Sequence, residues 1–218
     1  MRKILVSFGS LVLVLLLVWP NSLYPQEVKE IRLPTPQMDG GKPLMQALRD
    51  RHSSREFSTD ELPLQVLSNL LWAGFGINRP DSGKRTAPSA VNWQNIDIYV
   101  ALSKGLFLYN AKENVLKLVL AEDIRAATGT QAFVKDVPLN LVYVADFSKI
   151  PRQTEEIKSF YSAAHTGFIS QNVYLYCASE GLATVVRGLI DREAMAAVMK
   201  LRPEQKVMLA QSVGYPKK

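Results

Sequence analysis

The sequence is poor in the residue types that build metal centres and disulfide frameworks. Its 218 residues include 1 cysteine, Cys177, and 2 histidines, His52 and His165. One cysteine excludes an intramolecular disulfide framework and a multi-cysteine zinc site, and two histidines argue against a histidine-rich metal centre. Glycine and proline number only 12 each, which excludes collagen-like and low-complexity classes.

A strong charge of one sign is also missing. The formal net charge is +6, and Arg2 and Lys3 account for two of these charges. No stripe of lysine and arginine interleaved with aromatic residues is present, so the sequence does not favour a nucleic-acid partner. The modest positive excess is consistent with a partner that is a small molecule bearing a phosphate.

Several motifs that mark catalytic or nucleotide-binding sites are absent. The sequence has no G-x-S-x-G, no P-loop, no H-E-x-x-H and no G-x-G-x-x-G dinucleotide fingerprint. What remains is ordinary globular composition, with 47% hydrophobic and 21% charged residues. At this length we expect one main domain with a substantial hydrophobic core.

The first 26 residues are typical of a targeting signal rather than of part of the folded domain. Arg2 and Lys3 precede an apolar run over 4–19 that only two serines interrupt. A membrane span needs about 20 apolar residues, so the run favours a cleaved export signal. The poor cleavage pattern around Ser22 leaves a retained membrane anchor open, and a buried helix is a further alternative. We therefore expect an exported protein or one anchored by residues 1–26.

The remaining chain predicts an α+β fold. Residues 27–42 are polar and rich in Pro and Gly, which is typical of a linker, and the main domain is expected over 43–218. Apolar spacing and capping residues predict helices, and alternating or continuous apolar runs predict strands in a mostly antiparallel sheet flanked by helices. The expected helices cover 43–50, 64–74, 154–179 and the segment after Asp191, short helices lie near 121–128 and 130–135, and the expected strands cover 96–102, 106–110, 115–120, 139–146, 182–187 and 206–214.

The densest polar cluster, R-H-S-S-R, follows the first of these helices. Arg51, His52, Ser53 and Arg55 offer guanidinium, imidazole and hydroxyl groups at a spacing that could surround an anion. The alternative is a solvated basic end of a helix, where arginine also interacts favourably with the helix dipole.

Two further polar clusters lie later in the chain. The segment 85–94, within a long loop over 76–95, contains Pro88, Ser89 and Asn92, and an amide side chain can read the edge of a heterocycle. The segment 184–188 ends a strand at Gly188, where a flat ligand can approach the backbone closely. A turn-rich connector and a simple strand end are the corresponding structural alternatives.

Taken together, these clusters resemble the nitroreductase-type flavoprotein family. The resemblance rests on R-H-S-S-R at 51–55, P-S-A-V-N-W-Q at 88–94, the helix sequence over 167–184 and V-R-G-L-I-D at 186–191. The ending V-G-Y-P is also similar to that of the family. The resemblance implies a nitroreductase-like fold and an intertwined homodimer with FMN bound at the subunit interface.

The resemblance also implies roles for individual residues. Arg51 and Ser53 would hold the FMN phosphate, with His52 beside the phosphate or the ribityl chain. Arg55 would face the N1/O2 edge of the ring and Asn92 the O2/N3 edge, and the backbone near Arg187 and Gly188 would face N5 and O4. The segment containing Pro88 and Ser89 would carry Asn92. No catalytic protein side chain and no metal is implied, because the flavin carries the chemistry.

The implied activity is ping-pong hydride transfer from NAD(P)H through FMN to a nitro-aromatic, quinone or similar flat acceptor. The alternatives are azoline oxidation on a peptide, a non-catalytic flavin-binding module, and a structural envelope protein. This sequence departs from the family in its few basic residues after the last strand, so Lys217, Lys218 or Arg85 would complete the phosphate site. Arg187 stands where some members carry an acid, which suggests anionic substrates.

Overall fold

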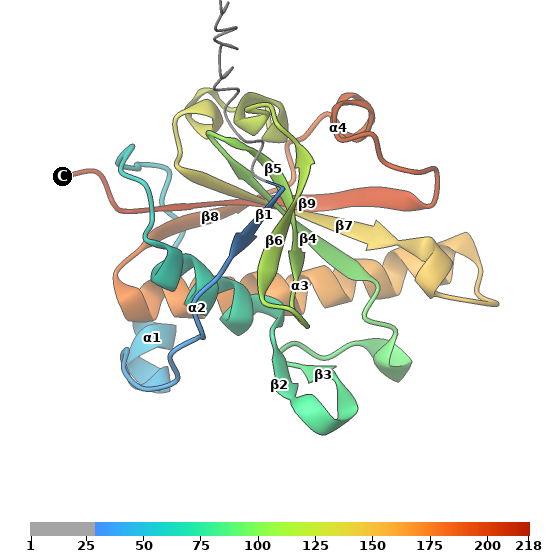
Figure 1. Cartoon of the computed structure of the whole chain (residues 1–218), viewed down its shortest axis with the longest axis horizontal. Helices are drawn as coiled ribbons and strands as arrows, with labels where there is room; N and C mark the ends of the chain where they lie inside the picture. The colour runs from blue at the N-terminus through green and yellow to red at the C-terminus, as the bar shows by residue number, and fades with distance from the viewer. Residues whose placement is uncertain (1–28) are drawn as a thin grey trace, which may run out of the picture.

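The computed structural model describes residues 29–218, and the targeting signal expected over 1–26 lies outside them. Its centre is a seven-stranded sheet in the order β1-β6-β5-β4-β7-β9-β8, in which every neighbouring pair is antiparallel (Figure 1). The expected α+β class with a central antiparallel sheet is thus confirmed. The strands are β1 (Glu30–Arg32), β4 (Ile96–Leu102), β5 (Gly105–Asn110), β6 (Val115–Leu120), β7 (Leu139–Asp146), β8 (Ala183–Arg187) and β9 (Gln205–Gly214).

Four α-helices surround the sheet, close to the predicted ranges. They are α1 (Leu44–Asp50), α2 (Leu64–Phe75), α3 (Glu155–Glu180) and α4 (Arg192–Val198). The Thr154 side chain accepts the Ile157 amide at the start of α3, and Asp191 accepts the Ala194 amide at the start of α4. Gly181 ends α3 at a φ of 72°, a left-handed conformation that glycine adopts without strain. The short helices expected near 121–135 are 3₁₀ turns, Arg125–Thr128 and Ala132–Lys135.

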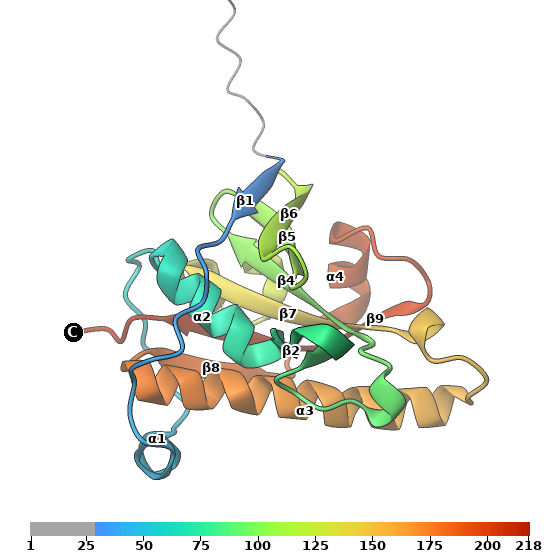
Figure 2. The same cartoon turned by 60° about the horizontal axis from the view of Figure 1, so that its bottom comes forward.

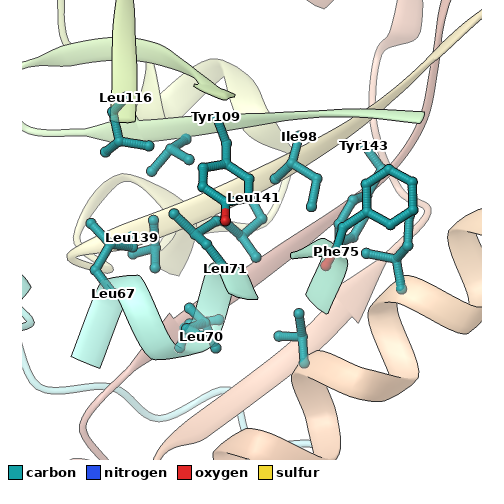
Figure 3. Close-up of a cluster of buried hydrophobic side chains, with 14 of the residues drawn as sticks. Leu67, Leu70, Leu71, Phe75, Ile98, Tyr109, Leu116, Leu139, Leu141 and Tyr143 are labelled. Carbon is teal, nitrogen blue, oxygen red and sulfur yellow. The ribbon is translucent and has the colours of Figure 1, made fainter. Parts of the chain in front are cut away.

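The main core lies between the sheet and the helices α2 and α3. Leucines on one face of α2, among them Leu70 and Leu71, meet Ile98 of β4 and Leu141 of β7 (Figure 3). These side chains are almost fully buried, and burying one contributes about 1.5–3 kcal/mol relative to leaving it exposed. The strand β7 is buried along its whole length, as its continuous apolar sequence predicts for an interior strand.

The opposite face of the sheet carries a second, smaller core. Met195 of α4 and Met199 just beyond it pack there with Val142, Val144 and Ala210 from the sheet. Both faces of β7 are therefore covered, and β8 and β9 at the end of the sheet lie between α3 on one side and the 3₁₀ turns on the other.

Two segments differ from their expected structure. Within the segment 27–42, expected to be a linker, β1 pairs with β6, and the side chains of Ile31 and Leu33 are buried. A strand of three residues is too short for its alternation to stand out in a sequence rich in proline. Within the loop 76–95, the strands β2 (Ile77–Arg79) and β3 (Lys84–Arg85) form a small hairpin.

The helix α3 is the longest of the described helices and runs along one edge of the molecule (Figure 2). Its buried residues recur three or four positions apart, and they face the sheet and α2. No helix of residues 29–218 is both long enough and apolar enough to cross a membrane.

Candidate functional site

The R-H-S-S-R segment lies against the start of β8. The helix α1 ends at Asp50, and the Ser54 amide then donates a hydrogen bond of 2.9 Å to the Thr184 carbonyl. The first and third polar clusters of the sequence are therefore neighbours in the fold, although about 130 residues separate them in the chain.

Tyr174 of α3 connects these two clusters. Its hydroxyl lies 2.8 Å from Ser53 Oγ and also accepts the Val186 amide at 2.8 Å. The guanidinium carbon of Arg51 lies 5.3 Å from the centre of the Tyr174 ring, which is a favourable cation–π distance. Tyr174 is buried, so one rigid side chain on α3 sets the positions of Arg51, Ser53 and the end of β8.

The C-terminal tail completes this part of the site. Phe57 and Pro216 form an isolated antiparallel bridge, and the Lys217 amide donates to the Glu56 carbonyl at 3.3 Å. An open cavity of about 960 Å³ lies beside them, with Arg55 and the two C-terminal lysines in its lining. Its other lining residues are Glu56, Phe57, Ser58, Thr59, Asp60, Phe133, Asp136, Val137, Gly181, Tyr215 and Pro216.

His52 is exposed beside these cations. Its Nδ1 lies 2.8 Å from the Asp50 carbonyl oxygen, which can only accept, so Nδ1 carries the proton of the neutral ring. The Nε2 atom takes no part in that hydrogen bond. The arrangement orients the imidazole on the loop that carries Arg51 and Ser53.

The Asn92 loop, defined here as residues 88–94, has an unusual backbone. Val91, Asn92 and Gln94 have φ angles of 47°, 59° and 47°, which are left-handed values that non-glycine residues rarely adopt. The Gln94 amide donates to Ser89 Oγ at 3.0 Å, which closes the loop on itself. Asn92 is exposed at the tip, where its side chain can meet a ligand.

Gln94 holds the Asn92 side chain in one orientation. Its Nε2 donates to Asn92 Oδ1 at 2.9 Å, so the Asn92 amide presents its NH₂ group outward. Arg85 supports Gln94 from behind with a hydrogen bond of 2.7 Å from Nε to Oε1, and donates from Nη1 to the Phe75 carbonyl. The guanidinium of Arg85 is thus engaged in the loop, and the geometry does not support Arg85 as a phosphate ligand.

His165 of α3 supports the Asn92 loop at its other end. It is buried, and its Nε2 accepts the Ala90 amide at 2.8 Å. Its Nδ1 lies 2.7 Å from Asn95 Oδ1, while Asn95 Nδ2 donates to Ser162 Oγ at 2.8 Å. Burial lowers the pKa of His165 below its ordinary value.

The side chain of Arg187 does not face the site. It is buried on the side of the sheet away from α3, where its guanidinium donates to the Thr128 carbonyl, Thr128 Oγ1, Asn140 Oδ1 and Ser212 Oγ. Burial without a carboxylate partner lowers the pKa of Arg187 to about 10. The expectation that this arginine favours anionic substrates is therefore wrong, since only its backbone and the exposed Gly188 reach the end of β8.

The Asn92 loop is held at a different point along α3 from the first and third clusters. Tyr174, at the first and third clusters, and His165, at the Asn92 loop, are nine positions apart on α3. Nine residues span about 13 Å along the helix axis, and the two side chains lie at the two margins of the buried face of α3. Each of the two parts of the proposed ligand site is held by its own side chain of α3.

The donor set fits FMN. Guanidinium and hydroxyl groups at Arg51, Ser53 and Arg55 suit a phosphate and an anionic ring edge. The outward NH₂ of Asn92 suits a ring carbonyl, and the glycine turn after β8 gives close access to the backbone. The fold and these residues therefore define a site that binds an anionic group next to a flat heterocycle.

A model of the nitroreductase family matches residues 48–215, which include all three clusters and the whole of α3. The chain therefore belongs to the nitroreductase family, and it is a nitroreductase-family enzyme. The family binds FMN.

Individual relatives agree with this assignment. The crystal structure of a provisionally named nitroreductase from Ralstonia eutropha JMP134 has 43% sequence identity and a TM-score of 0.84, covering 87% of this chain and 90% of that one. A provisionally named nitroreductase of Methanocaldococcus jannaschii is 27% identical over 169 residues, 73% of this chain and 85% of the relative. A structure from Desulfovibrio desulfuricans, solved with FMN, has 20% identity and a TM-score of 0.59, covering 81% of this chain and 88% of that one.

The structure adds residues that sequence reasoning did not single out. Tyr174 and Asn95 had no motif to mark them, because an isolated tyrosine in a helix and an asparagine before a strand have common structural explanations. His165 stood out in the sequence only as one of two histidines. The one available signal was the spacing of Ser162 and His165 on one face of α3, which buries two polar groups side by side.

Proposed function

We propose that this protein is an FMN-dependent oxidoreductase that transfers a hydride from NAD(P)H to a nitro-aromatic, quinone or similar flat acceptor in a ping-pong cycle. The observation that carries this proposal is the meeting of the R-H-S-S-R segment, the end of β8 and the C-terminal tail around Tyr174 and the adjacent cavity. FMN, when bound, would accept the hydride from the nicotinamide and pass it on.

Each part of the chain has a defined task in this proposal. Arg51, Ser53 and Lys217 bind the phosphate, and His52 lies beside it. Arg55 stabilises negative charge at the N1/O2 edge of the ring, where a fixed cation is worth more than in water. Asn92 donates from its NH₂ group to a ring carbonyl, because Gln94 already occupies its Oδ1. The backbone at Gly188 faces the edge that carries N5 and O4.

We further propose that the working form is a homodimer with each site shared between two chains. The outward face of α3 and the adjacent α1 expose large apolar side chains, namely Leu44, Met45, Leu48, Ile157, Phe160, Tyr161 and Phe168. A helix with apolar surface on the side away from its own core needs a partner to cover it. Figure 2 shows that, among residues 29–218, only α1 lies beyond α3 on that side, near one end.

The location of the protein follows from its first 26 residues, which we propose to be an export signal or an N-terminal anchor. In either case FMN would be bound outside the cytoplasm. The electron donor at that location is then part of the proposal to be tested, with NADH and NADPH as the candidates.

The decisive experiment is the visible spectrum of the purified protein, followed by rapid-mixing reduction with NADH and NADPH. We expect bound flavin that either nicotinamide reduces and that a quinone or nitro-aromatic compound reoxidises. The double variant Arg51→Ala, Arg55→Ala should lose FMN, whereas Arg32→Ala, Lys104→Ala removes equal charge at exposed positions and should keep it.

Each alternative predicts a different result in this experiment. A protein that gains no flavin on adding FMN contradicts the proposal. Bound FMN without turnover for any donor and acceptor indicates a flavin-binding module. Reoxidation only by an azoline-containing peptide indicates the alternative acceptor class.

A further inference from the structure

The protonation state of His165 is fixed by its neighbours. Asn95 Nδ2 donates to Ser162 Oγ, so Asn95 Oδ1 is turned toward His165 and accepts from Nδ1–H. The other ring nitrogen, Nε2, must then be the bare atom that accepts the Ala90 amide at 2.8 Å. A second proton on Nε2 would face the Ala90 N–H directly, so this contact exists only with the neutral ring.

The hydrogen bond from the Ala90 amide to His165 restrains the Asn92 loop, whose backbone conformation is energetically unfavourable. Three non-glycine residues of the Asn92 loop, including the β-branched Val91, have positive φ. Each such residue costs about 1–3 kcal/mol and persists only where the surroundings enforce it. On its inner side the loop is held by Ser89, Gln94 and Arg85, and on the side of α3 by the hydrogen bond from the Ala90 amide to His165.

We propose that neutral His165 is a positioning residue that keeps the Asn92 loop in its flavin-binding shape, and that protonation of His165 releases this loop and weakens FMN binding in acid. The proposal rests on the proposed function, because it takes Asn92 as the group that contacts the flavin ring. The sequence motifs name only residues expected to touch the flavin. The proposal adds His165, which supports the loop at Ala90, two positions before Asn92, and whose support depends on pH.

The surroundings of His165 leave burial as the cause that favours the neutral ring. Trp93 and Tyr161 lie edge-on or tilted to it, with ring centres 6.4 and 6.1 Å away, and Asn95 and Ser162 complete the contacts. None of these neighbours is an acidic or basic side chain. Arg85 binds Gln94 and the Phe75 carbonyl, and Asp97, which lies near Arg85, forms an ion pair with Lys149.

The first measurement uses the purified chain without FMN. Hydrogen exchange of the peptide covering 88–94, corrected for the intrinsic effect of pH, reports the protection of the Ala90 amide. We expect this protection to fall about tenfold between pH 7.5 and pH 5.0, because protonation removes the acceptor. Peptides from β9 should keep their protection over the same range.

The matched variant is His165→Gln, whose side-chain oxygen can accept the Ala90 amide and does not titrate. Its loop protection should change less than twofold over the same pH range. A second variant, Asn95→Asp, places a carboxylate against Nδ1 and favours the protonated ring, so the loss of protection should begin at a higher pH. This variant serves if the glutamine variant does not fold.

The second measurement is the FMN dissociation constant at the same two pH values. The FMN phosphate also titrates in this range, but it is the same in the wild type and in His165→Gln. We therefore expect the wild type to lose about tenfold more affinity between pH 7.5 and pH 5.0 than the variant does.

The outcomes separate the two proposals. Equal pH dependence in the wild type and both variants, in protection or in affinity, overturns the role of His165. Absence of FMN binding at every pH overturns the proposed function, while the exchange data still decide whether His165 holds the loop.

Discussion

The hydroxyls of Tyr174 and Ser53 lie 2.8 Å apart and join the R-H-S-S-R segment to α3, the longest of the described helices. The same Tyr174 hydroxyl accepts the Val186 amide from β8. A single oxygen atom therefore holds two segments that the proposed flavin site uses, the R-H-S-S-R segment and the end of β8.

Removing this oxygen should loosen both segments. Tyr174→Phe keeps the ring beside Arg51 but leaves the Val186 amide without its acceptor and Ser53 without its partner. We expect the free energy of unfolding to fall by about 1–2 kcal/mol and the FMN dissociation constant to rise about tenfold. Chemical denaturation and fluorescence titration with FMN measure these two effects.

Tyr176→Phe is the matched control on the same helix. Its hydroxyl makes a long contact of 3.4 Å with the Val66 carbonyl and also interacts with the Asn69 side chain, and it has no hydrogen bond to Ser53 or β8 among the described residues. FMN affinity in this variant should stay within twofold of the wild type. Equal losses of affinity in the two variants would show that Tyr174 acts through general stability and not through the site.

Arg187 should matter to the fold more than to substrate choice. Arg187→Ala removes hydrogen bonds to Thr128, Asn140 and Ser212 and leaves a cavity beneath β8. We expect the free energy of unfolding to fall by about 3 kcal/mol, measured by urea denaturation. The exposed Arg32→Ala should change it by less than about 0.5 kcal/mol, and a similarly small effect at Arg187 would contradict the buried network.

Much of the scaffold follows from local sequence signals. Thr154 and Gly181 bound α3 as their capping chemistry predicts, and Asp191 caps α4. The continuous apolar run of β7 correctly predicts an interior strand. These features depend on residues near one another in the chain, and such signals can be read without the fold.

Other features depend on contacts between distant segments, which a single sequence does not display. The approach of Ser54 to Thr184 requires the topology of the whole sheet. Because side chains alternate along β8, Arg187 lies on the face of the sheet away from α3. The V-R-G-L-I-D motif does not indicate which face of the sheet binds the ligand, so this orientation could not be predicted. Val91 carries a positive φ that its β-branched type argues against, so no propensity rule would have predicted the shape of the Asn92 loop.

Acid should weaken the fold through Asp146. Burial by itself would raise the pKa of this carboxyl, but hydrogen bonds from Ser148 and the charge of Arg202 outweigh burial and hold the pKa below the ordinary 3.8. A carboxyl whose pKa is lower in the folded state stabilises the fold above about pH 4, and this contribution is lost as pH falls through the folded value.

The variant Asp146→Asn tests this assignment. We expect a free energy of unfolding lower by about 1–2 kcal/mol at pH 7 and a shallower decline below pH 4, both measured by urea denaturation. Asp39→Asn, at an exposed position, should have little effect at either pH. A decline below pH 4 that is equally steep in Asp146→Asn would assign the acid sensitivity to other carboxyls.

Cys177 should be inert in the native protein. It is fully buried on α3, and burial raises the pKa of its thiol far above the ordinary range, so almost no thiolate is available at pH 8. We expect no labelling by iodoacetamide within an hour under native conditions and complete labelling in denaturant, followed by mass spectrometry. Native labelling would show that α3 separates from the sheet on that timescale.

The sharpest test of the shared site is complementation between two inactive variants. Arg51→Ala with Ser53→Ala removes the phosphate half, and Asn92→Ala removes a group on the other half, the Asn92 loop that His165 of α3 holds. If the halves of one site come from different chains, a mixed dimer contains one intact site and one doubly damaged site. Mixing the unfolded variants and refolding them together should then restore about a quarter of the wild-type FMN binding. This fraction follows because random pairing makes half of the dimers mixed, and each mixed dimer has one intact site out of two. Binding that stays at the level of the separate variants would place both halves of the site within one chain.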